Sequence, residues 1–523
     1  MALPRARRER PSLRRRLPGP PPTPGRLYLI VAGAALALAT VSLLYPSTPN
    51  YDPWAWVIWG REIIHFDLVT SGGPTWKPLP MIFTTLFAPL GGAAPDLWLV
   101  IARAGGIMAV AMAFALAFRL TRAAIGPTRS AARSTRQPTA AVLAELPPLL
   151  AGTAAAVGVL VLSQYVYDVT LGYSEGLLMC VTLLAILRHL DGNRVQAFAF
   201  GFAASLDRPE IWPFLGLYAI YLWRKEPRAR KLIVMLLALI VPLWLLPDLV
   251  GSGSLLRGVK YALIAKNGVA TAHCPFCTEI TTVAWPLVIT PFKISVALFL
   301  VAVPVGLTRA LRLGGAAWIR TVVNMVLAHR VVLATVLFGI TLFVEDAALT
   351  QFGSSGNNRY VFLAASMLII GGAVAWAGAM IWLGNVLARF SGPALGVVCA
   401  LLVSVSAFVA VSPTRGSTLI RVGPTLHALR FEAEQRADLP EAVRLAGGVK
   451  RLESCGPIAT NPSTAPQLAW VLRTPINQLQ SLTGHVLVQM AAYQGAGLLP
   501  SAPSSQYRLV AQVRTVRILS DCF

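Results

Sequence analysis

The sequence predicts an all-α polytopic membrane domain of about eleven transmembrane helices, with surface helices in the first outer loop, followed by a small α+β domain. Three observations predict this class. The 523 residues are 55% hydrophobic and only 13% charged, with a mean hydropathy of +0.63, whereas a soluble chain carries about 25% charged residues. Apolar runs near the roughly 20 residues that span a bilayer recur along most of the chain. Ordinary polarity returns after Ser412.

The apolar runs give the order of the spans. Seven runs meet or approach the length of a transmembrane helix, at residues 27–45, 97–118, 232–250, 294–307, 331–344, 361–383 and 394–411. Four shorter runs are weaker candidates, at residues 146–162, 176–187, 195–206 and 212–223. We therefore expect about eleven crossings. The chain shows no convincing internal repeat, which disfavours a transporter built from inverted repeats.

The net charge of +23 could indicate nucleic-acid binding, but the basic residues gather where spans end. Such clusters fall at alternate span ends, as the positive-inside rule requires of cytoplasmic loops. Examples are Arg119 and Arg122, Arg224 and Lys225, and Arg389. The charge therefore predicts a multi-pass protein of the cell inner (plasma) membrane, with its N-terminus in the cytoplasm and its C-terminal domain outside. The partners expected are the bilayer and its anionic headgroups, with no nucleic acid.

Composition divides the chain into three parts. Residues 1–26 are a basic, Pro-rich cytoplasmic tail, residues 27–412 form the transmembrane domain, and residues 413–523 form an extracytoplasmic domain. In the last part, helical patterns cover residues 424–446 and 465–473, and strand patterns cover residues 486–490, 507–513 and 516–519. About 110 residues are enough for a small α+β domain.

Four cysteines lie in segments that this topology places outside, where disulfides persist. Cys455 and Cys522 are a candidate bridge in the terminal domain. Cys274 and Cys277 have the spacing of a redox motif, but no thioredoxin-like pattern surrounds them, so a short structural disulfide is favoured. No His, Cys, Asp and Glu spacing predicts a closed metal site.

The first outer loop carries the most informative segment, residues 51–66. Asp52 precedes Pro53, which is an ordinary start for a helix, with aspartate as the N-cap and proline at the first position. The following aromatic and apolar residues predict a helix on the membrane surface with its tryptophans at headgroup level. In a functional interpretation, Asp52 still caps the helix, and its carboxylate is also presented just outside the first span.

Further motifs follow in order. Lys77-Pro78-Leu79-Pro80 precedes a short amphipathic run and the second span, and residues 167–175, 206–210 and 357–360 are polar segments on the same outer side. This order resembles the GT-C superfamily of polyprenyl-phosphate-sugar transferases, especially the branch of protein O-mannosyltransferases and lipid A aminoarabinose transferase. Asp52 matches the acidic position of the first outer loop in that branch, although many relatives have a pair of acidic residues there.

The resemblance implies roles for particular residues. Asp52 would be the general base that takes the proton of the acceptor hydroxyl. The cations that would hold the lipid phosphate are Lys77, Arg208 and Arg359, because guanidinium groups can bind phosphate through two parallel hydrogen bonds. The remaining candidate substrate-binding residues are Glu175, Glu210 and Tyr360. Ion pairing at the ends of spans, or anchoring of Arg359 at the interface, explains these charges equally well.

The function that the resemblance implies is inverting transfer of a hexosyl or pentosyl group. The donor would be a polyprenyl-phosphate sugar and the acceptor a cell-envelope glycan, glycolipid or protein. No cofactor is expected, and a divalent metal requirement stays open. The chain lacks a Walker A loop, a dinucleotide fingerprint and a nucleophile elbow. The alternatives are a transporter or lipid flippase, and a non-catalytic envelope assembly protein.

Overall fold

The computed structural model describes residues 24–124, 145–264, 268–311, 315–412, 422–479, 483–491 and 506–523. Most of the predicted basic tail, residues 1–26, lies outside these described residues. So does the predicted boundary between the membrane domain and the terminal domain, at residue 413.

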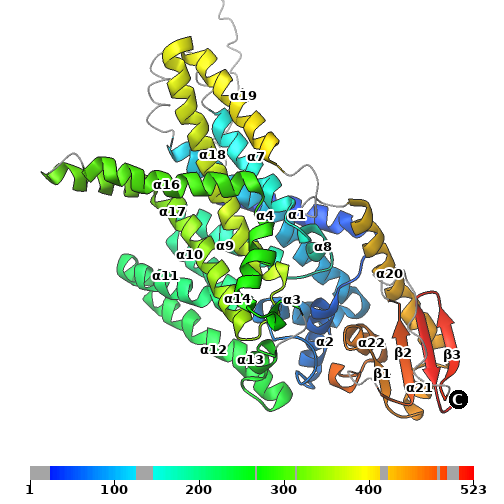
Figure 1. The fold of residues 1–523 in the computed structure, drawn as a ribbon. Helices are drawn as coiled ribbons and strands as arrows, with labels where there is room; N and C mark the ends of the chain where they lie inside the picture. Colours follow the sequence, from blue (N-terminus) through cyan, green and yellow to red (C-terminus); the bar gives the residue numbers. More distant parts are fainter. Residues whose placement is uncertain are drawn as a thin grey trace, which may run out of the picture.

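Helix α4 (Ala94–Ala124) lies at the centre of a helical bundle (Figure 1). It packs against α1 (Pro24–Ser42), α7 (Leu146–Leu160), α9 (Glu175–Leu190) and α18 (Phe362–Ser391). Buried alanines recur along α4. Small side chains let neighbouring helices approach closely, which is how apolar helices associate in a membrane without a hydrophobic driving force.

Six further helices surround this centre: α10 (Arg194–Ser205), α11 (Trp212–Lys225), α12 (Arg230–Ser252), α16 (Thr290–Leu311), α17 (Gly315–Gln351) and α19 (Pro393–Val411). Every predicted apolar run falls on a helix, although α4, α17 and α18 extend more than one turn beyond their runs. By length and composition, five helices within the described residues can cross a membrane, or six if one bent helix pair forms a single span. The number of eleven crossings therefore stays a prediction.

Short elements occupy the connections at one end of the bundle, which we call the polar end. They are α2 (Tyr51–His65), α3 (Pro78–Phe87), η1 (Ala88–Ala93), α8 (Tyr165–Thr170), η2 (Pro209–Ile211), α13 (Arg257–Ala262), η4 (Val269–Thr271), α14 (Pro275–Thr278), η5 (Glu279–Ala284), α15 (Trp285–Leu287) and η6 (Asn358–Val361). At the opposite end of α11 lies η3 (Pro227–Ala229).

The start of α2 differs from the prediction. Asn50, not Asp52, is the N-cap, and its side-chain oxygen accepts a hydrogen bond from the backbone N–H of Tyr51. Asp52 instead lies in the first helical turn. The capping explanation for Asp52 is therefore wrong, and its carboxylate is free to make a tertiary contact.

The prediction that the tryptophans of α2 lie at headgroup level is also wrong. Trp56 and Trp59 are fully buried in protein, against Trp98 and Trp76 respectively. The predicted apolar face ends at Phe66, which is 98% exposed. The amphipathic pattern of α2 was real, but α3, α4 and the terminal domain cover its apolar face.

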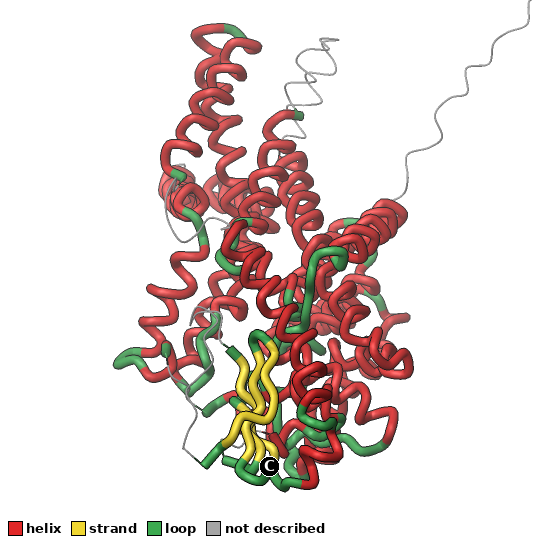
Figure 2. The backbone as a smooth tube through the Cα atoms, turned by 90° about the vertical axis from the view of Figure 1, so that its right-hand side faces the viewer, coloured by secondary structure: helices red, strands yellow, loops and turns green. Residues whose placement is uncertain are grey.

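The C-terminal part forms the predicted α+β unit. Its helices are α20 (Val422–Leu445), α21 (Val449–Ser454) and α22 (Ala465–Leu472), with the short η7 (Ile476–Leu479). Its strands are β1 (Ile458–Thr460), β2 (Val486–Met490), β3 (Arg508–Val513) and β4 (Val516–Ser520), in the order β1-β2-β4-β3. Figure 2 shows this sheet beside the helices of the polar end. Only the β1–β2 pair is parallel.

The C-terminal part is docked directly on the polar end. Arg436 of α20 donates a hydrogen bond to Asp96, with Nη1 2.6 Å from Oδ1, and its guanidinium lies over the ring of Trp54. Trp470 of α22 packs against the same Trp54 with ring centroids 5.8 Å apart. Residues on both sides of this contact belong to one hydrophobic core, so the terminal domain is a fixed neighbour of α2.

Candidate active site

All seven residues predicted as catalytic or substrate-binding converge at the polar end. Asp52 comes from the first turn of α2, Lys77 precedes α3, and Glu175 begins α9. Arg208 precedes η2, and Arg359 lies in η6. We call the full set the polar cluster: Asp52, Lys77, Glu175, Arg208, Glu210, Arg359 and Tyr360. Five segments far apart in the sequence thus supply one site.

Asp52 and Arg359 form the contact on which the cluster is centred. Arg359 Nη2 lies 2.7 Å from Asp52 Oδ2, and both side chains are largely buried. A charge-assisted hydrogen bond in a low-dielectric setting is stronger than the same pair at the surface. This pairing joins the predicted base to a predicted phosphate-binding cation across 307 residues of sequence.

Aromatic rings hold the two arginines in place. The guanidinium of Arg359 lies 3.9 Å from the ring centroid of Tyr173, and that of Arg208 lies 4.0 Å from the centroid of Tyr360. Arg359 also lies 5.3 Å from the Tyr360 ring. Cation–π contacts stabilise a guanidinium without using its N–H donors. The donors of both arginines are therefore left for acceptors.

Lys77 occupies a second part of the cluster. Its ammonium donates to Ser174 Oγ at 2.9 Å, lies 3.5 Å from Glu175 Oε1 and 3.9 Å from Asp207 Oδ2. The indole of Trp56 lies 5.5 Å from the ammonium. Lys77, Arg208 and Arg359 all act electrostatically on Glu175, so this buried carboxylate lies among the three predicted phosphate-binding cations.

Two buried guanidinium nitrogens have no acceptor. Arg208 pairs with Glu210 through Nη1 at 3.1 Å, while its Nη2 has no hydrogen-bond partner among the described residues. Arg359 pairs with Asp52 through Nη2, while its Nη1 is likewise unpartnered within the described chain. A buried donor without a partner is destabilising by about 1–3 kcal/mol. Such donors suit an anionic ligand such as phosphate, whose oxygens match the geometry of a guanidinium group.

The sequence did not single out three further residues of the site. Burial raises the pKa of Asp168 to about 7 and that of Asp207 to about 6, although both lie near cations. Burial also raises the pKa of the Tyr173 phenol. All three belong to segments that the sequence marked as polar, but only the folded chain shows that they lie beside Arg359 and Lys77.

A residue of the terminal domain reaches the same place. Glu432 of α20 accepts a hydrogen bond from the Tyr167 hydroxyl at 2.5 Å, and its charge acts on Asp168. Burial raises the pKa of Glu432. The sequence could not connect Glu432 with the site, because more than 200 residues separate it from Tyr167.

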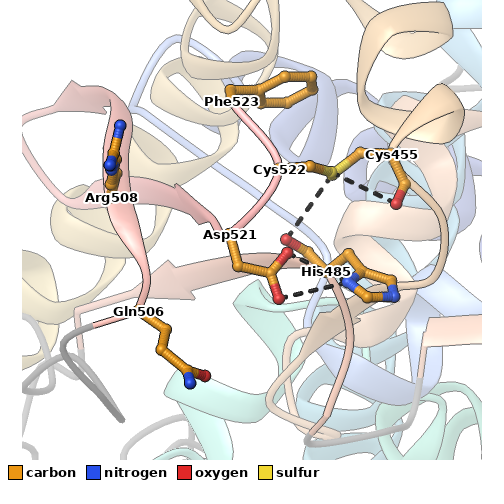
Figure 3. Close-up of a pocket in the computed structure, with 7 residues that line it drawn as sticks. All are labelled: Cys455, His485, Gln506, Arg508, Asp521, Cys522 and Phe523. Atoms are coloured by element: carbon orange, nitrogen blue, oxygen red, sulfur yellow. Dashed lines mark hydrogen bonds and ion pairs between the residues drawn. A yellow bond between two sulfur atoms is a disulfide. The ribbon is translucent and has the colours of Figure 1, made fainter.

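The four candidate disulfide cysteines are close in pairs, Cys274 with Cys277 and Cys455 with Cys522. Cys455, Cys522 and Asp521 place three potential metal-ligand atoms together, but two of these atoms belong to a disulfide and cannot bind a metal as thiolates. The same residues line a surface pocket of about 740 Å³, beside the ion pair of His485 and Asp521 (Figure 3). This pocket is formed by the terminal domain alone.

Comparison with known structures returns two proteins that have been solved with a lipid phosphate bound. The chain is similar to ArnT from Cupriavidus metallidurans bound to undecaprenyl phosphate, with 14% identity and a TM-score of 0.48, and to the same protein in the apo state, with 15% identity and a TM-score of 0.47. Each match covers 95% of this chain and 98% of that chain.

A third similar structure is the oligosaccharyltransferase AglB from Archaeoglobus fulgidus, in complex with an inhibitory peptide and a dolichol-phosphate. Its identity is 13% and its TM-score 0.34, and the match covers 86% of this chain and 64% of that chain. No protein-family model and no curated protein matches the chain.

Proposed function

We propose that this chain is a membrane glycosyltransferase that moves a sugar from a polyprenyl-phosphate donor to a glycan, glycolipid or protein of the cell envelope. One observation carries the proposal. The buried Arg359 is paired with Asp52, stacked on Tyr173, and keeps an N–H group without an acceptor. A carboxylate suited to proton removal and a cation suited to phosphate are therefore in direct contact.

In the proposed reaction, Asp52 takes the proton of the acceptor hydroxyl as that oxygen bonds to the anomeric carbon of the sugar. The bond between the anomeric carbon and the phosphate oxygen breaks, and polyprenyl phosphate leaves with the bonding electrons. Attack from the face opposite the leaving group inverts the anomeric centre. Arg359 and Arg208 neutralise the charge that develops on the leaving phosphate.

The remaining members of the polar cluster have supporting roles in this proposal. Lys77 lies beside Ser174 and Glu175, where it would bind the phosphate as a point charge. Glu175 and Glu210 hold the cations in position through ion pairs. Tyr360 fixes the plane of the Arg208 guanidinium, so that its unpartnered Nη2 keeps one direction.

The terminal domain would form the acceptor side of the site. Its helix α20 contributes Glu432, which is hydrogen-bonded to Tyr167 beside Asp168. Carboxylates are common acceptors for sugar hydroxyls, because each oxygen accepts two hydrogen bonds.

Replacement of Asp52 by Asn tests the proposal directly. Full-length protein in proteoliposomes is incubated with a radiolabelled polyprenyl-phosphate hexose or pentose and a cell-envelope extract as acceptor. We expect Asp52→Asn to lower transfer by about 10²- to 10⁴-fold, the usual contribution of a general base. Asp67→Asn is the matched control, because Asp67 is an exposed carboxylate of the same loop.

Two results would contradict the proposal. Equal turnover of Asp52→Asn and wild type would remove Asp52 from the chemistry. Movement of the intact labelled donor across the bilayer, without any transfer of sugar, would instead support a lipid flippase. Binding of polyprenyl phosphate is measured in parallel, so that loss of chemistry is distinguished from loss of the donor.

A further inference from the structure

The turn between α11 and α12 carries a dense group of cations at the end of the bundle opposite the polar end. The two helices lie at the edge of the bundle, and η3 forms the turn that joins them (Figure 1). Five of the eight residues from 224 to 231 are basic and have exposed side chains: Arg224, Lys225, Arg228, Arg230 and Lys231. We call these five residues the basic turn. None belongs to the polar cluster, so the candidate active site does not account for them.

Two carboxylates at this end of the bundle have cationic partners. Glu226, the one carboxylate among residues 224–231, pairs with Arg194 of α10, with Nη1 2.8 Å from Oε1. Asp191, which follows α9, pairs with Arg119 and Arg188. Among the described residues, no member of the basic turn forms an ion pair. The positive charge of the turn is therefore available to an anionic partner.

The backbone of the turn is held by packing and hydrogen bonds. Ala229 and Leu222 are buried in a small core formed by α10, α11 and α12. The backbone N–H of Ala229 donates to the carbonyl of Glu226 at 2.9 Å, and that of Glu226 donates to the carbonyl of Leu222 at 2.8 Å. A fixed backbone lowers the entropy cost of binding a ligand. The cations therefore project from a preorganised turn.

Trp223 lies beside the basic turn and is typical of a residue at the membrane surface. Its side chain is exposed, and the guanidinium of Arg230 lies 5.2 Å from its ring centroid. Arg230 Nε also donates to the backbone carbonyl of Trp223 at 3.3 Å. Exposed tryptophans of membrane proteins are enriched at the level of the lipid headgroups. A cation stacked on such a ring would lie among headgroup phosphates.

Exposed apolar residues continue from the basic turn along both helices. Leu217 and Ile220 lie on one face of α11 with Arg224, because residues three, four and seven positions apart share a helix face. Val234 of α12 is exposed and lies three positions after Lys231. Helix α12 belongs to a candidate membrane span, of whose most apolar 18-residue window only 17% is buried. The cations therefore lie at the end of apolar surfaces that face away from the protein.

We propose that the basic turn binds the headgroup of an anionic phospholipid, with the acyl chains lying along the outward faces of α11 and α12. Clusters of basic residues next to a membrane helix bind anionic headgroups, and arginine can bind a phosphate through two parallel hydrogen bonds. A lipid covers both the cations and the apolar faces, whereas a nucleic acid or an acidic protein would cover the cations alone. This binding is independent of the proposed sugar transfer.

Photochemical labelling of the full-length protein tests the surface. Nanodiscs of phosphatidylcholine contain a small fraction of phosphatidylglycerol with a photoactivatable acyl chain, and labelled peptides are mapped by mass spectrometry. We expect label on the peptides of α11 and α12 in the wild type. The test variant carries three substitutions in the basic turn, Arg224→Gln, Arg228→Gln and Lys231→Gln. Its label should fall at least about tenfold, because each basic residue near anionic lipid strengthens binding about fivefold.

The control variant removes the same charge from the exposed surface of the terminal domain, through Arg430→Gln, Arg444→Gln and Lys450→Gln. Its label on α11 and α12 should equal that of the wild type. A second probe, phosphatidylcholine with the same photoactivatable chain, should label these helices weakly and equally in all three proteins. Circular dichroism checks that both variants are folded.

Any of three outcomes would overturn the proposal. Label that is unchanged in the test variant, or that falls equally in the control, would show that the basic turn is not the site. Equal label of the wild type by the two lipid probes would show that the charge of the headgroup is not recognised. Displacement of the anionic probe by glycerol phosphate at the concentration of the probe would assign the cations to a soluble anion, because the apolar faces would then contribute nothing.

Discussion

A buried carboxylate in the terminal domain and one at the polar end differ in the number of hydrogen bonds that they accept. Asp438 of α20 is 2% exposed and accepts from Arg514 Nε and Nη2, at 3.1 and 2.5 Å, and from Thr515 N and Oγ1, at 3.3 and 2.8 Å. Glu279 is as deeply buried and accepts from no donor among the described residues. Asp438 therefore accepts from four donor atoms, whereas Glu279 accepts from none among the described residues.

The contrast distinguishes buried charges that stabilise the fold from buried charges that lower its stability. A buried charge with all its hydrogen bonds made is part of the structure, whereas breaking such a set is strongly destabilising. A buried charge with unused hydrogen-bonding capacity lowers stability and is retained for another reason. Among the described residues, Arg208 and Arg359 belong to the second kind, which is why we place an anionic ligand at them.

The largest effect on stability is expected from Asp438→Ala. Removing this carboxylate leaves the buried N–H of Thr515 without an acceptor and frees Arg514. We expect a loss of about 2–4 kcal/mol in the free energy of unfolding. Denaturation of full-length protein in detergent, followed by circular dichroism, measures it.

Glu441→Ala is the control for this change, because Glu441 pairs with Arg444 at the surface of the same helix. An exposed pair contributes little to stability, so the effect should stay within about 0.5 kcal/mol. If the two substitutions lowered the free energy of unfolding equally, a buried carboxylate with all its hydrogen bonds would not differ in effect from an exposed one.

A smaller effect is expected from Arg359→Lys, and it should fall on ligand binding. Lysine keeps the charge but cannot stack on Tyr173, bond to Asp52 and offer a further N–H group in one plane. We expect the affinity for polyprenyl phosphate to fall about tenfold, which corresponds to about 1.4 kcal/mol. Isothermal titration in detergent measures it.

Arg430→Lys provides the comparison for this prediction. Arg430 is an exposed residue of α20 that pairs with Glu434, and its replacement should leave lipid binding unchanged. Because both substitutions keep the charge, unchanged affinity in both variants would point to general attraction between basic residues and anionic lipid, and would remove Arg359 as a specific phosphate ligand.

A pH-dependent effect on stability is expected at Glu62, a buried carboxylate of α2 outside the polar cluster. Burial raises its pKa to about 7 from an ordinary value of 4.5, although the backbone N–H of Val69 donates to it. Because the pKa is higher in the folded state, ionisation opposes folding increasingly as the pH rises from about 4.5 to about 7, and by a constant amount above that. Glu62→Gln should therefore gain melting temperature relative to wild type between pH 5 and pH 8.

The change at Glu62 should leave sugar transfer intact. A difference in melting temperature that does not vary with pH would show that Glu62 does not titrate in this range. A loss of transfer would mean that the polar cluster extends further along α2 than its contacts indicate.

Much of the secondary structure was predictable from the sequence. The strand at Val486–Met490 was predicted residue for residue, and α22 to within one residue. Strand β1 (Ile458–Thr460) was missed, because three residues carry no measurable alternation. Long apolar runs identify helices reliably, since a continuous apolar surface of that length suits few other structures.

The environment of α2 was not predictable. Its amphipathic pattern shows that one face is covered but not by what, and lipid and protein both cover apolar side chains. The structure shows Trp54 beside Trp470 and Arg436, from a domain nearly 400 residues away in sequence. A periodic pattern indicates that one face of a helix is buried, but only the tertiary contacts show what covers that face.

For this protein, the sequence by itself predicted seven candidate residues for the site. Polar residues are expensive at the ends of apolar helices, so Asp52, Lys77 and Arg359 were visible against the hydrophobic background. The tertiary structure decided what each touches: that Asp52 meets Arg359, and that Lys77 meets Glu175. Hydrophobic patterning records burial along the chain, whereas the pairing of charges depends on distances in space, which no local pattern encodes.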